Sequence, residues 1–231
     1  MLSIENIQSS YGETVILRDV GMEIGRGQVV ALMGRNGVGK TTLLKTVIGL
    51  ISPDSGRISF DGEDITAWSP ERRAIHGIGY VPQGRDIFPH LTVSENLLIG
   101  LEARGIKRPS IPEGIFEMFP ALKGLLSRKG GNLSGGQQQQ LAIARVLITE
   151  PKLLLMDEPT EGIQPSVVFE IENTIRFIKE QGNVSILLVE QFMEFALRLS
   201  DFCYVMERGS IVFKGAVGEL SKEEIQNHLT I

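Results

Sequence analysis

The sequence predicts an α/β fold organised around a parallel β-sheet, and three observations support that prediction. Short continuous apolar runs, of the kind found in strands buried on both faces, recur along the chain. One of them, at 28–33, leads through a glycine-rich loop into a helical pattern at 42–50. Another, at 153–158, ends in two acidic residues. Because ligands bind at the carboxyl ends of parallel strands, these features predict a ligand site at one edge of the sheet.

The glycine-rich loop at 34–41 reads Gly-Arg-Asn-Gly-Val-Gly-Lys-Thr, which is the spacing of a phosphate-binding P-loop. Glycine lets such a loop bring backbone N–H groups against an anion, and the following helix aims its unpaired N–H groups at the same point. Lys40 would add charge for the β- and γ-phosphates, and the Thr41 hydroxyl would bind Mg²⁺. A simple glycine turn would not require Gly-Lys-Thr at this spacing. The residues predicted to bind a nucleoside triphosphate are Gly34, Arg35, Asn36, Gly37, Val38, Gly39, Lys40, Thr41 and Thr42.

Composition sets outer limits on the class of protein. Of the 231 residues, 42% are apolar and 22% are charged, which is ordinary for a globular chain of one large domain with a small lobe. Lys and Arg number 23 against 28 Asp and Glu, and a net charge of −5 argues against a protein that chiefly coats DNA. Cys203 is the only cysteine, which excludes an internal disulfide and suits a reducing compartment. No apolar stretch approaches bilayer length, so a role at a membrane would require docking onto another protein.

The first part of the chain is predicted to form strands. Apolar alternation at 2–8 and 15–24 indicates two strands joined by a turn at 11–14, and a further strand is expected at 57–60. Tyr11 lies in that turn, where its ring would offer a stacking face for adenine. The alternative is that Tyr11 simply packs at the end of a strand, and spacing alone does not decide between the two.

The stretch from 91 to 129 is predicted to be helical and poor in strands, as an inserted lobe would be. Its prolines and the Gly-Gly pair at 130–131 interrupt the helical pattern, which predicts that the lobe moves relative to the core. Gln83 lies before this stretch, directly after a short predicted strand at 78–81. Its amide would bind Mg²⁺ and the attacking water, although a polar loop residue is the simpler interpretation of a single glutamine.

Residues 132–137 read Asn-Leu-Ser-Gly-Gly-Gln and open a helix that extends through Ile148. Ser134 with Gln137 three residues later is a capping-box pattern, which is the purely structural interpretation. That interpretation does not explain two glycines in the first turn, where each weakens a helix by about 1 kcal/mol relative to alanine. Glycine lets an anion approach the helix N-terminus closely. We therefore predict a second phosphate site at this helix end.

The run at 153–158 ends in Asp157 and Glu158, and its unbroken hydrophobicity predicts a central parallel strand. Asp157 suits Mg²⁺, directly or through water, and Glu158 is placed to orient or deprotonate the water that attacks a γ-phosphate. Two solvated acids capping a strand are the alternative, which fits poorly beside a P-loop that needs Mg²⁺. Gln191 follows another buried strand, at 185–189, and would reach the same site if the two strands are neighbours.

The tail of the chain carries shorter patterns. Strands are expected at 202–206 and 211–214, and a helix is expected near 221–229. We interpret the tail as structure that covers the core.

Together, the P-loop, Gln83, the Leu133–Gln137 run and the acidic strand resemble the ATP-binding subunit of an ABC transporter, over essentially the whole chain. The combination of Leu-Ser-Gly-Gly-Gln with a P-loop is highly specific for this family. The resemblance implies an α/β P-loop NTPase core of the RecA-like type with a parallel sheet, an N-terminal antiparallel β-subdomain and an inserted helical subdomain. It implies one domain over 1–231, with the nucleotide-binding core at 1–83 and 131–231 and the helical subdomain at 84–130.

The resemblance also implies how the site residues divide their roles. Tyr11 would stack on adenine, and Gln83 would read the γ-phosphate and Mg²⁺ while linking to a permease. Two cassettes would face each other head to tail. The residues expected to contact the ATP of the partner cassette are Ser134, Gly135, Gly136 and Gln137. The expected catalytic residues are Lys40, Glu158 and Gln191, and the expected Mg²⁺ ligands are Thr41, Gln83 and Asp157.

The family implies ATP and Mg²⁺ as ligands and a membrane transporter as the setting. The expected partners are a second ABC ATPase subunit, favoured to be a sister subunit, two transmembrane permease subunits and, indirectly, a solute-binding protein. No nucleic acid partner is expected. The chain would then be peripheral, on the cytoplasmic face of the inner membrane.

Within the family, the segments 34–40, 161–165 and 188–191 look most like the urea importer's ATPase, with the branched-chain amino acid importer's ATPases close behind. Import of a small polar solute, with urea favoured, is therefore the expected function, and branched-chain amino acid import is the first alternative. A soluble ABC ATPase acting on DNA is the alternative from another class. Such proteins are expected to carry long coiled coils or zinc-bearing insertions, and this sequence has neither heptads nor the cysteines.

Two residues depart from the general family pattern. Gln191 occupies the place of the usual switch histidine, and Gln164 that of the usual acid after the catalytic strand. Gln191 can hydrogen-bond a phosphate or a water but cannot become a cation, so hydrolysis is expected to be slower or differently gated. A cassette that binds ATP only as a structural partner is the further alternative that these two residues leave open.

Overall fold

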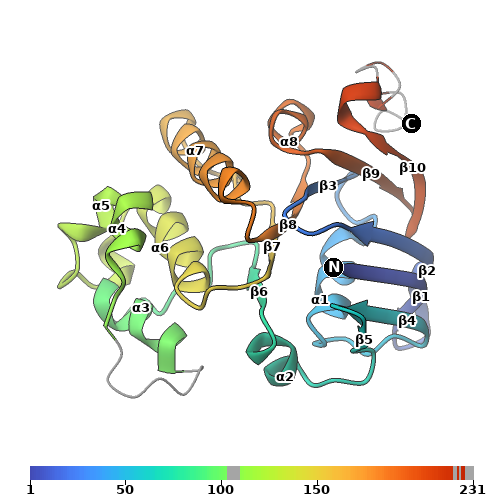
Figure 1. Cartoon of the computed structure of the whole chain (residues 1–231), viewed down its shortest axis with the longest axis horizontal. Helices are drawn as coiled ribbons and strands as arrows, with labels where there is room; N and C mark the ends of the chain where they lie inside the picture. Colours follow the sequence, from blue (N-terminus) through green and yellow to red (C-terminus); the bar gives the residue numbers. More distant parts are fainter. Residues whose placement is uncertain (103–109, 221–222, 224, 227–231) are drawn as a thin grey trace.

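The computed structural model describes residues 1–102, 110–220, 223 and 225–226. Figure 1 shows an antiparallel sheet on one side, a second sheet flanked by helices in the middle, and a lobe of helices on the other side. The predicted α/β fold with a parallel sheet is confirmed.

Strands and helices alternate through the middle of the chain. The described strands are β1 (Leu2–Tyr11), β2 (Thr14–Ile24), β3 (Val29–Met33), β4 (Ser55–Phe60), β5 (Glu63–Asp64), β6 (Ile78–Val81), β7 (Leu153–Asp157), β8 (Ser185–Glu190), β9 (Phe202–Glu207) and β10 (Ser210–Ala216). The described helices are α1 (Lys40–Val47), α2 (Pro70–Ile75), α3 (Val93–Glu102), α4 (Glu113–Met118), α5 (Pro120–Lys123), α6 (Gly135–Leu147), α7 (Pro165–Gln181) and α8 (Met193–Leu199), with 3₁₀ turns η1 (Gly130–Asn132) and η2 (Val217–Glu219).

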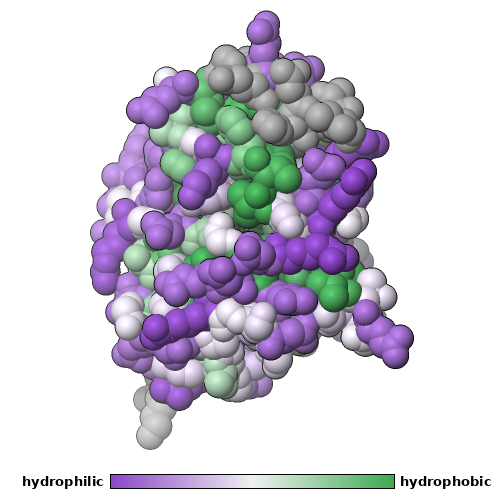
Figure 2. Space-filling model, turned by 90° about the vertical axis from the view of Figure 1, so that its right-hand side faces the viewer, coloured by the Kyte–Doolittle hydropathy of each residue, from purple (hydrophilic) through white to green (hydrophobic). Residues whose placement is uncertain are grey.

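The antiparallel sheet has the strand order β2-β1-β4-β5. Leu2 on β1 lies opposite Ile24 on β2 and Phe60 on β4, and all three are buried. Polar residues between these positions point to the other face, as the two-residue period of a strand requires. Figure 2 looks onto this side of the molecule and shows a mostly hydrophilic surface, with hydrophobic residues gathered mainly in its upper half. The sheet therefore has one buried face and one face toward solvent.

The larger sheet has the order β10-β9-β3-β8-β7-β6, and all of its described pairs are parallel except β10 with β9. The register places Met33 opposite Glu190, Asp157 opposite Val189, and Val81 opposite Met156. The carboxyl ends of β3, β8, β7 and β6 therefore lie at one edge, which brings together the segments that follow these strands.

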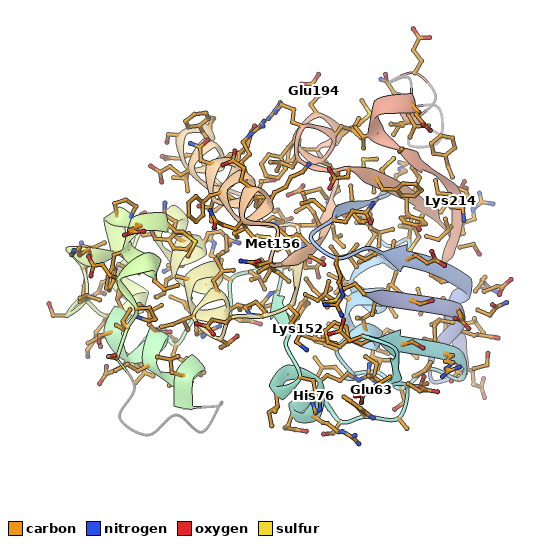
Figure 3. The ribbon with its side chains drawn as sticks, viewed as in Figure 1. Glu63, His76, Lys152, Met156, Glu194 and Lys214 are labelled. Atoms are coloured by element: carbon orange, nitrogen blue, oxygen red, sulfur yellow. The ribbon has the colours of Figure 1, made fainter. Side chains whose placement is uncertain are left out.

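Alternate residues of β7 face two different layers. Leu153 and Leu155 pack in the core that contains α1 and the antiparallel sheet. Leu154 and Met156 pack in the core that contains α6, α7 and the helical lobe, which we define as the described helices α3, α4 and α5. Met156 accordingly lies between the lobe and the rest of the molecule in Figure 3. The helices α1 and α6 thus cover opposite faces of the parallel sheet.

The interpretation of the tail as covering structure is wrong for its first strand. β9 pairs with β3 in parallel and with β10 on its other side, so it is an internal strand of the core sheet. Its residues 203–206 are buried, because a strand with neighbours on both sides and layers on both faces has no solvent-exposed edge. Of the helix expected near 221–229, the structure describes Glu223, Ile225 and Gln226, which are helical, and the rest lies outside the described residues.

Three helices were not expected from the sequence. The helix α2 is short, and α8 follows its strand after only two residues. The helix α7 does carry a readable signal, because Ile171, Ile175 and Ile178 recur at helical spacing and are all buried. In the described parts of the chain, no helix combines the length and the apolar character that crossing a membrane requires.

A buried arginine binds the C-terminal carbonyl groups of the helix that follows the P-loop. Arg73, on α2, has only 2% of its surface exposed. Its guanidinium donates hydrogen bonds of 2.8 to 3.1 Å to four backbone carbonyl oxygens, those of Thr46, Val47, Thr66 and Trp68. The last carbonyls of a helix have no partner within it, and here a cation satisfies two of them and complements the helix dipole.

We predict that Arg73→Met lowers the free energy of unfolding by about 3 kcal/mol, because four buried carbonyl oxygens would lose charge-assisted hydrogen bonds. Urea denaturation of the full chain measures this change. The matched control is Arg72→Met, since Arg72 is exposed and lies over the Trp68 ring. Equal stability of the two variants would show that Arg73 does not hold α1.

Candidate functional site

The P-loop lies between β3 and α1, at the carboxyl edge of the parallel sheet. Gly39 is the residue before α1, with a φ of 114°, which side-chain-bearing residues rarely adopt. A Cβ at Gly39 would also lie 3.1 Å from the Leu17 side chain. No side chain caps the helix, so its first N–H groups are left to donate to another partner. This arrangement makes the α1 N-terminus a site suited to an anion.

The ammonium group of Lys40 lies at the centre of the site. Only 4% of Lys40 is exposed, and its Nζ donates to the carbonyl oxygens of Gly34 at 2.8 Å and Arg35 at 3.0 Å. It also forms an ion pair of 3.2 Å with Glu158 Oε1. A buried cation needs such partners, because an unpaired charge in the interior is strongly unfavourable. Lys40 thus links the P-loop to the end of β7.

Several polar groups hold the carboxylate of Glu158. Gln191 donates its Nε2–H to Glu158 Oε2 at 2.7 Å, and Gln83 donates more weakly to the same oxygen at 3.4 Å. Only 7% of Glu158 is exposed, and its backbone has a φ of 48°, in the left-handed region. Non-glycine residues in that region are held by their surroundings and cluster at functional sites. Gln191 meets Glu158 because β8 is the neighbour of β7, which is the condition under which the sequence placed Gln191 at this site.

Asp157 is fully buried beside the P-loop helix. Its carboxylate accepts hydrogen bonds from Thr41 and, at 3.3 Å, from the Tyr80 hydroxyl. Burial raises the pKa of Asp157, and the charge of Glu158 acts in the same direction, while the hydrogen bonds and Lys40 lower it. Asp157 Oδ1 has no hydrogen-bond partner.

A hydroxyl and a carboxylate with an unpartnered buried oxygen fit Mg²⁺, which is typically held in proteins by one or two carboxylates together with substrate phosphates. In the described part of the chain, no cluster of three or more His, Cys, Asp or Glu side chains suggests another metal ion.

A cavity of 390 Å³ opens over the P-loop. Its lining comes from the segments that follow β3, β6 and β7, and from β2: Ile16, Asn36, Gly37, Gly39, Lys40, Thr41, Thr42, Gln83 and Glu158. Tyr11 is not among these residues. Its side chain is 51% exposed at the end of β1, so it does not pack as a buried strand-end tyrosine.

The second predicted phosphate site is the N-terminus of α6. Ser134 accepts a hydrogen bond from the Gln137 N–H at 3.3 Å, and the Gln137 side chain accepts one from the Ser134 N–H at 3.0 Å. The capping box is therefore present. None of the residues 134–137 lines the cavity over the P-loop. Because α1 and α6 cover opposite faces of the sheet, the two helix ends are distinct features of one chain.

Gly136, one of the two glycines of α6, has a packing reason that the sequence did not reveal. A Cβ at Gly136 would lie 2.6 Å from Val167 Cγ2 on α7. A Cβ at Gly135 would lie 3.0 Å from the guanidinium of Arg85, which also donates to Gln138 at 3.3 Å. The contact with Val167 thus accounts for Gly136 without an anion, and an anion at this helix end is also compatible with a glycine there.

Sequence reasoning missed three residues around the site. The Tyr80 hydroxyl donates to Asp157, and burial raises the pKa of Tyr80, which keeps it a donor. Glu190 is buried at the end of β8 and accepts hydrogen bonds from Thr160, in the segment after Glu158. An acid ending the apolar run at 185–189 was the one available signal for Glu190.

A family model described as ABC transporter matches residues 17–161. The chain is 39% identical to the high-affinity branched-chain amino acid transport ATP-binding protein BraG of Pseudomonas aeruginosa, over 92% of this chain and 91% of that protein. It is 37% identical to the probable branched-chain amino acid transport ATP-binding protein LivF of Archaeoglobus fulgidus, over 97% of this chain and 95% of that protein.

Solved structures agree with the sequence comparisons. A nucleotide-free ATP-binding cassette from an ABC transporter superposes with a TM-score of 0.85 at 33% identity, covering 100% of this chain and 95% of that one. A dimeric cassette bound to ADP and phosphate, in a post-hydrolysis state, gives a TM-score of 0.83 at 25% identity over 94% and 99% of the two chains.

The fold and the site therefore define a P-loop nucleotide-binding cassette. More particularly, the chain belongs to the ABC transporter family, and as a member of that family it is an ATPase coupled to transport.

We predict that Gly136→Ala destabilises the protein by about 1 kcal/mol or more, because overpacking against Val167 outweighs the better helix propensity of alanine. Chemical denaturation of the full chain measures the effect. Helix propensity alone would give the opposite sign, a gain of about 1 kcal/mol.

The compensating variant tests the cause. Val167→Ala removes the methyl groups that a Cβ at position 136 would meet. In the Val167→Ala background, Gly136→Ala is expected to be neutral or stabilising. If the single variant Gly136→Ala is more stable than wild type, the packing explanation is wrong.

Proposed function

We propose that this chain is the ATP-hydrolysing subunit that drives import of branched-chain amino acids through a membrane ABC transporter. The observation that carries the enzymatic part is the joining of Lys40, Glu158 and Gln191 in one cluster at the P-loop, in which Lys40 and Glu158 are buried. The similarity to BraG and LivF along nearly their whole lengths supports the choice of solute.

Nucleotide binding would use the residues that line the 390 Å³ cavity. The P-loop backbone N–H groups and the uncapped α1 N-terminus would bind the phosphates, and Lys40 would exchange its carbonyl partners for β- and γ-phosphate oxygens. Tyr11 would stack on adenine, since its exposed ring is free of a buried packing role. Arg35, Asn36 and Val38 would complete the loop around the phosphates.

Thr41, Asp157 and Gln83 would hold Mg²⁺, with Asp157 bound directly or through water. When bound, Mg²⁺ neutralises phosphate charge. The unpartnered oxygen of Asp157 supports this assignment, because a buried carboxylate oxygen without a partner is otherwise unfavourable. Gln83 lies on the segment after β6, where its amide already contacts Glu158 and, at 2.7 Å, Glu161.

Hydrolysis would begin at Glu158. Its carboxylate would orient or deprotonate a water for attack on the γ-phosphate, while Gln191 fixes the carboxylate through its Nε2–H. A histidine in the place of Gln191 could carry a positive charge, whereas the glutamine amide acts only through its dipole and hydrogen bonds. We therefore expect activity that does not depend on titration of residue 191.

The second helix end would serve a second nucleotide. In a head-to-tail dimer, Ser134, Gly135, Gly136 and Gln137 would contact the ATP bound by the partner cassette. The absence of these residues from the P-loop cavity and their position across the sheet from α1 support this division. The dimeric cassette among the similar structures supports it further. ATP would then favour the closed dimer, and hydrolysis would remove that preference.

The remaining assignments concern the transporter as a whole. We propose that 1–83 and 131–231 form the nucleotide-binding core and that 84–130 form the helical subdomain, which passes dimer closure to two permease subunits. The partner cassette would be a sister subunit, and a solute-binding protein would act outside the membrane. The chain would lie on the cytoplasmic face of the inner membrane.

The solute assignment differs from the sequence expectation, which favoured urea. The relatives named above are both described as branched-chain amino acid transport proteins, which favours the alternative. We predict that deleting the gene abolishes high-affinity uptake of labelled leucine and leaves urea uptake unchanged, and that the wild-type gene restores leucine uptake. Loss of urea uptake with unchanged leucine uptake would instead support urea as the solute. If the deletion reduced neither uptake, both solutes would be refuted.

We predict that Glu158→Gln retains ATP binding, loses about 100-fold or more in turnover and accumulates closed dimers with ATP. The amide keeps the shape of the carboxylate but is a far weaker base. Phosphate release by the assembled transporter and gel filtration with Mg-ATP measure the two effects. Undiminished turnover would remove Glu158 from its proposed role.

The contrasting variant is Lys40→Ala, which is expected to weaken Mg-ATP binding by about tenfold or more in calorimetry, since it removes a charge-assisted phosphate contact. A wild-type chain that binds ATP without releasing phosphate in the assembled transporter would be a structural partner instead of an active ATPase.

A further inference from the structure

Glu190, the last residue of β8, is a buried acid that the catalytic scheme above does not use. Only 1% of it is exposed. Its Oε1 accepts hydrogen bonds from the Thr160 hydroxyl at 2.8 Å and from the Thr160 N–H at 3.2 Å. Its Oε2 accepts a hydrogen bond from the Gln191 N–H at 3.2 Å, and the Phe192 backbone donates as well. One carboxylate thus joins the segment after β7 to the segment after β8.

These hydrogen bonds close a ring that contains the proposed catalytic carboxylate. The chain runs from Glu158 to Thr160, the Thr160 hydroxyl bonds Glu190, and Gln191 follows Glu190 and returns to Glu158 through its side chain. The Glu158 N–H donates to the Val189 carbonyl at 2.9 Å, which ties the same two segments a second time. Glu158, whose backbone is in the left-handed region, is itself part of this ring.

Burying a carboxylate at this position is energetically unfavourable. Burial raises the pKa of Glu190, which reflects the unfavourable desolvation of its charge, and the surrounding hydrogen bonds lower it again. A buried charge is tolerated when several donors meet it, but a neutral residue of similar shape is often as stable. What a carboxylate offers over such a residue is two acceptor oxygens on one planar group, one for each segment.

Resting on the proposed function of Glu158 and Gln191, we propose that Glu190 is a positioning residue for ATP hydrolysis. It fixes the Gln191 segment against the Glu158–Thr160 segment, so that the Gln191 amide meets the Glu158 carboxylate at hydrogen-bonding distance. Glu190 does not line the cavity over the P-loop, so it acts through its neighbours and not on the nucleotide.

The test compares Glu190→Gln with wild type in the full-length chain with Mg-ATP. The amide keeps the shape but supplies only one acceptor oxygen, so one of the two segments is released. We expect kcat for phosphate release to fall about tenfold or more, with KM for ATP changed by less than about threefold. Thr160→Val is expected to lower kcat in the same way, and Thr160→Ser to preserve it.

A double-mutant cycle separates positioning from general weakening. In a Gln191→Ala background, Glu190→Gln is expected to lower kcat by less than about threefold, because the amide that it positions is already absent. Glu172→Gln is the stability control, since Glu172 is another buried carboxylate, paired with Arg176 and Arg198 between α7 and α8. It is expected to lower stability without lowering kcat.

Amide hydrogen exchange provides a readout that is independent of turnover. Glu190→Gln is expected to increase exchange at the Thr160 or Gln191 N–H by about tenfold, with the other strand ends unchanged. Unchanged kcat with unchanged exchange, a loss that adds fully to that of Gln191→Ala, or an equal kcat loss in Glu172→Gln would each overturn the proposal. If the wild-type chain released no phosphate even in the assembled transporter, the proposed function would fail, and the exchange measurement would still decide whether Glu190 joins the two segments.

Discussion

The parallel register of β3, β8, β7 and β6 is the constraint on which the site depends. Its hydrogen bonds align the carboxyl ends of four strands whose following segments are far apart in the chain. The P-loop, Gln83, the Asp157–Glu158 pair and Gln191 each follow one of these strands. None of these segments could form the site alone, because none of them supplies phosphate-binding donors, side-chain amides and carboxylates together.

Gathering charged groups at a buried edge is unfavourable unless each charge has partners. Here Lys40 and Glu158 neutralise each other, and the carbonyls of the P-loop and the amide of Gln191 complete their hydrogen bonding. Asp157 is the exception, since one of its oxygens has no partner. Lys40 and Glu158 therefore have partners for their charges, whereas Asp157 keeps one oxygen available to the Mg²⁺ that is proposed to bind there.

The same sheet separates the two helix ends that are proposed to bind anions. Because successive residues of β7 point to opposite faces, α1 packs on one side and α6 on the other. A single chain thus presents a P-loop cavity and a capped helix end that does not line it. We interpret this separation as support for the proposed head-to-tail dimer, in which each chain would complete the site of the other.

The sequence by itself determined the P-loop, the buried strands at 28–33, 78–81, 153–158 and 185–189, and the helix that begins after Ser134, because these are local patterns of glycine, apolar residues and caps. Only the tertiary structure decided that β9 lies inside the sheet, that Gly136 faces Val167, and that Glu190 joins two segments. Strand order and side-chain contact depend on residues distant in the chain, which local periodicity does not encode. For the same reason, the kinds of groups in the site could be predicted from the sequence, whereas the fold decided which of them meet.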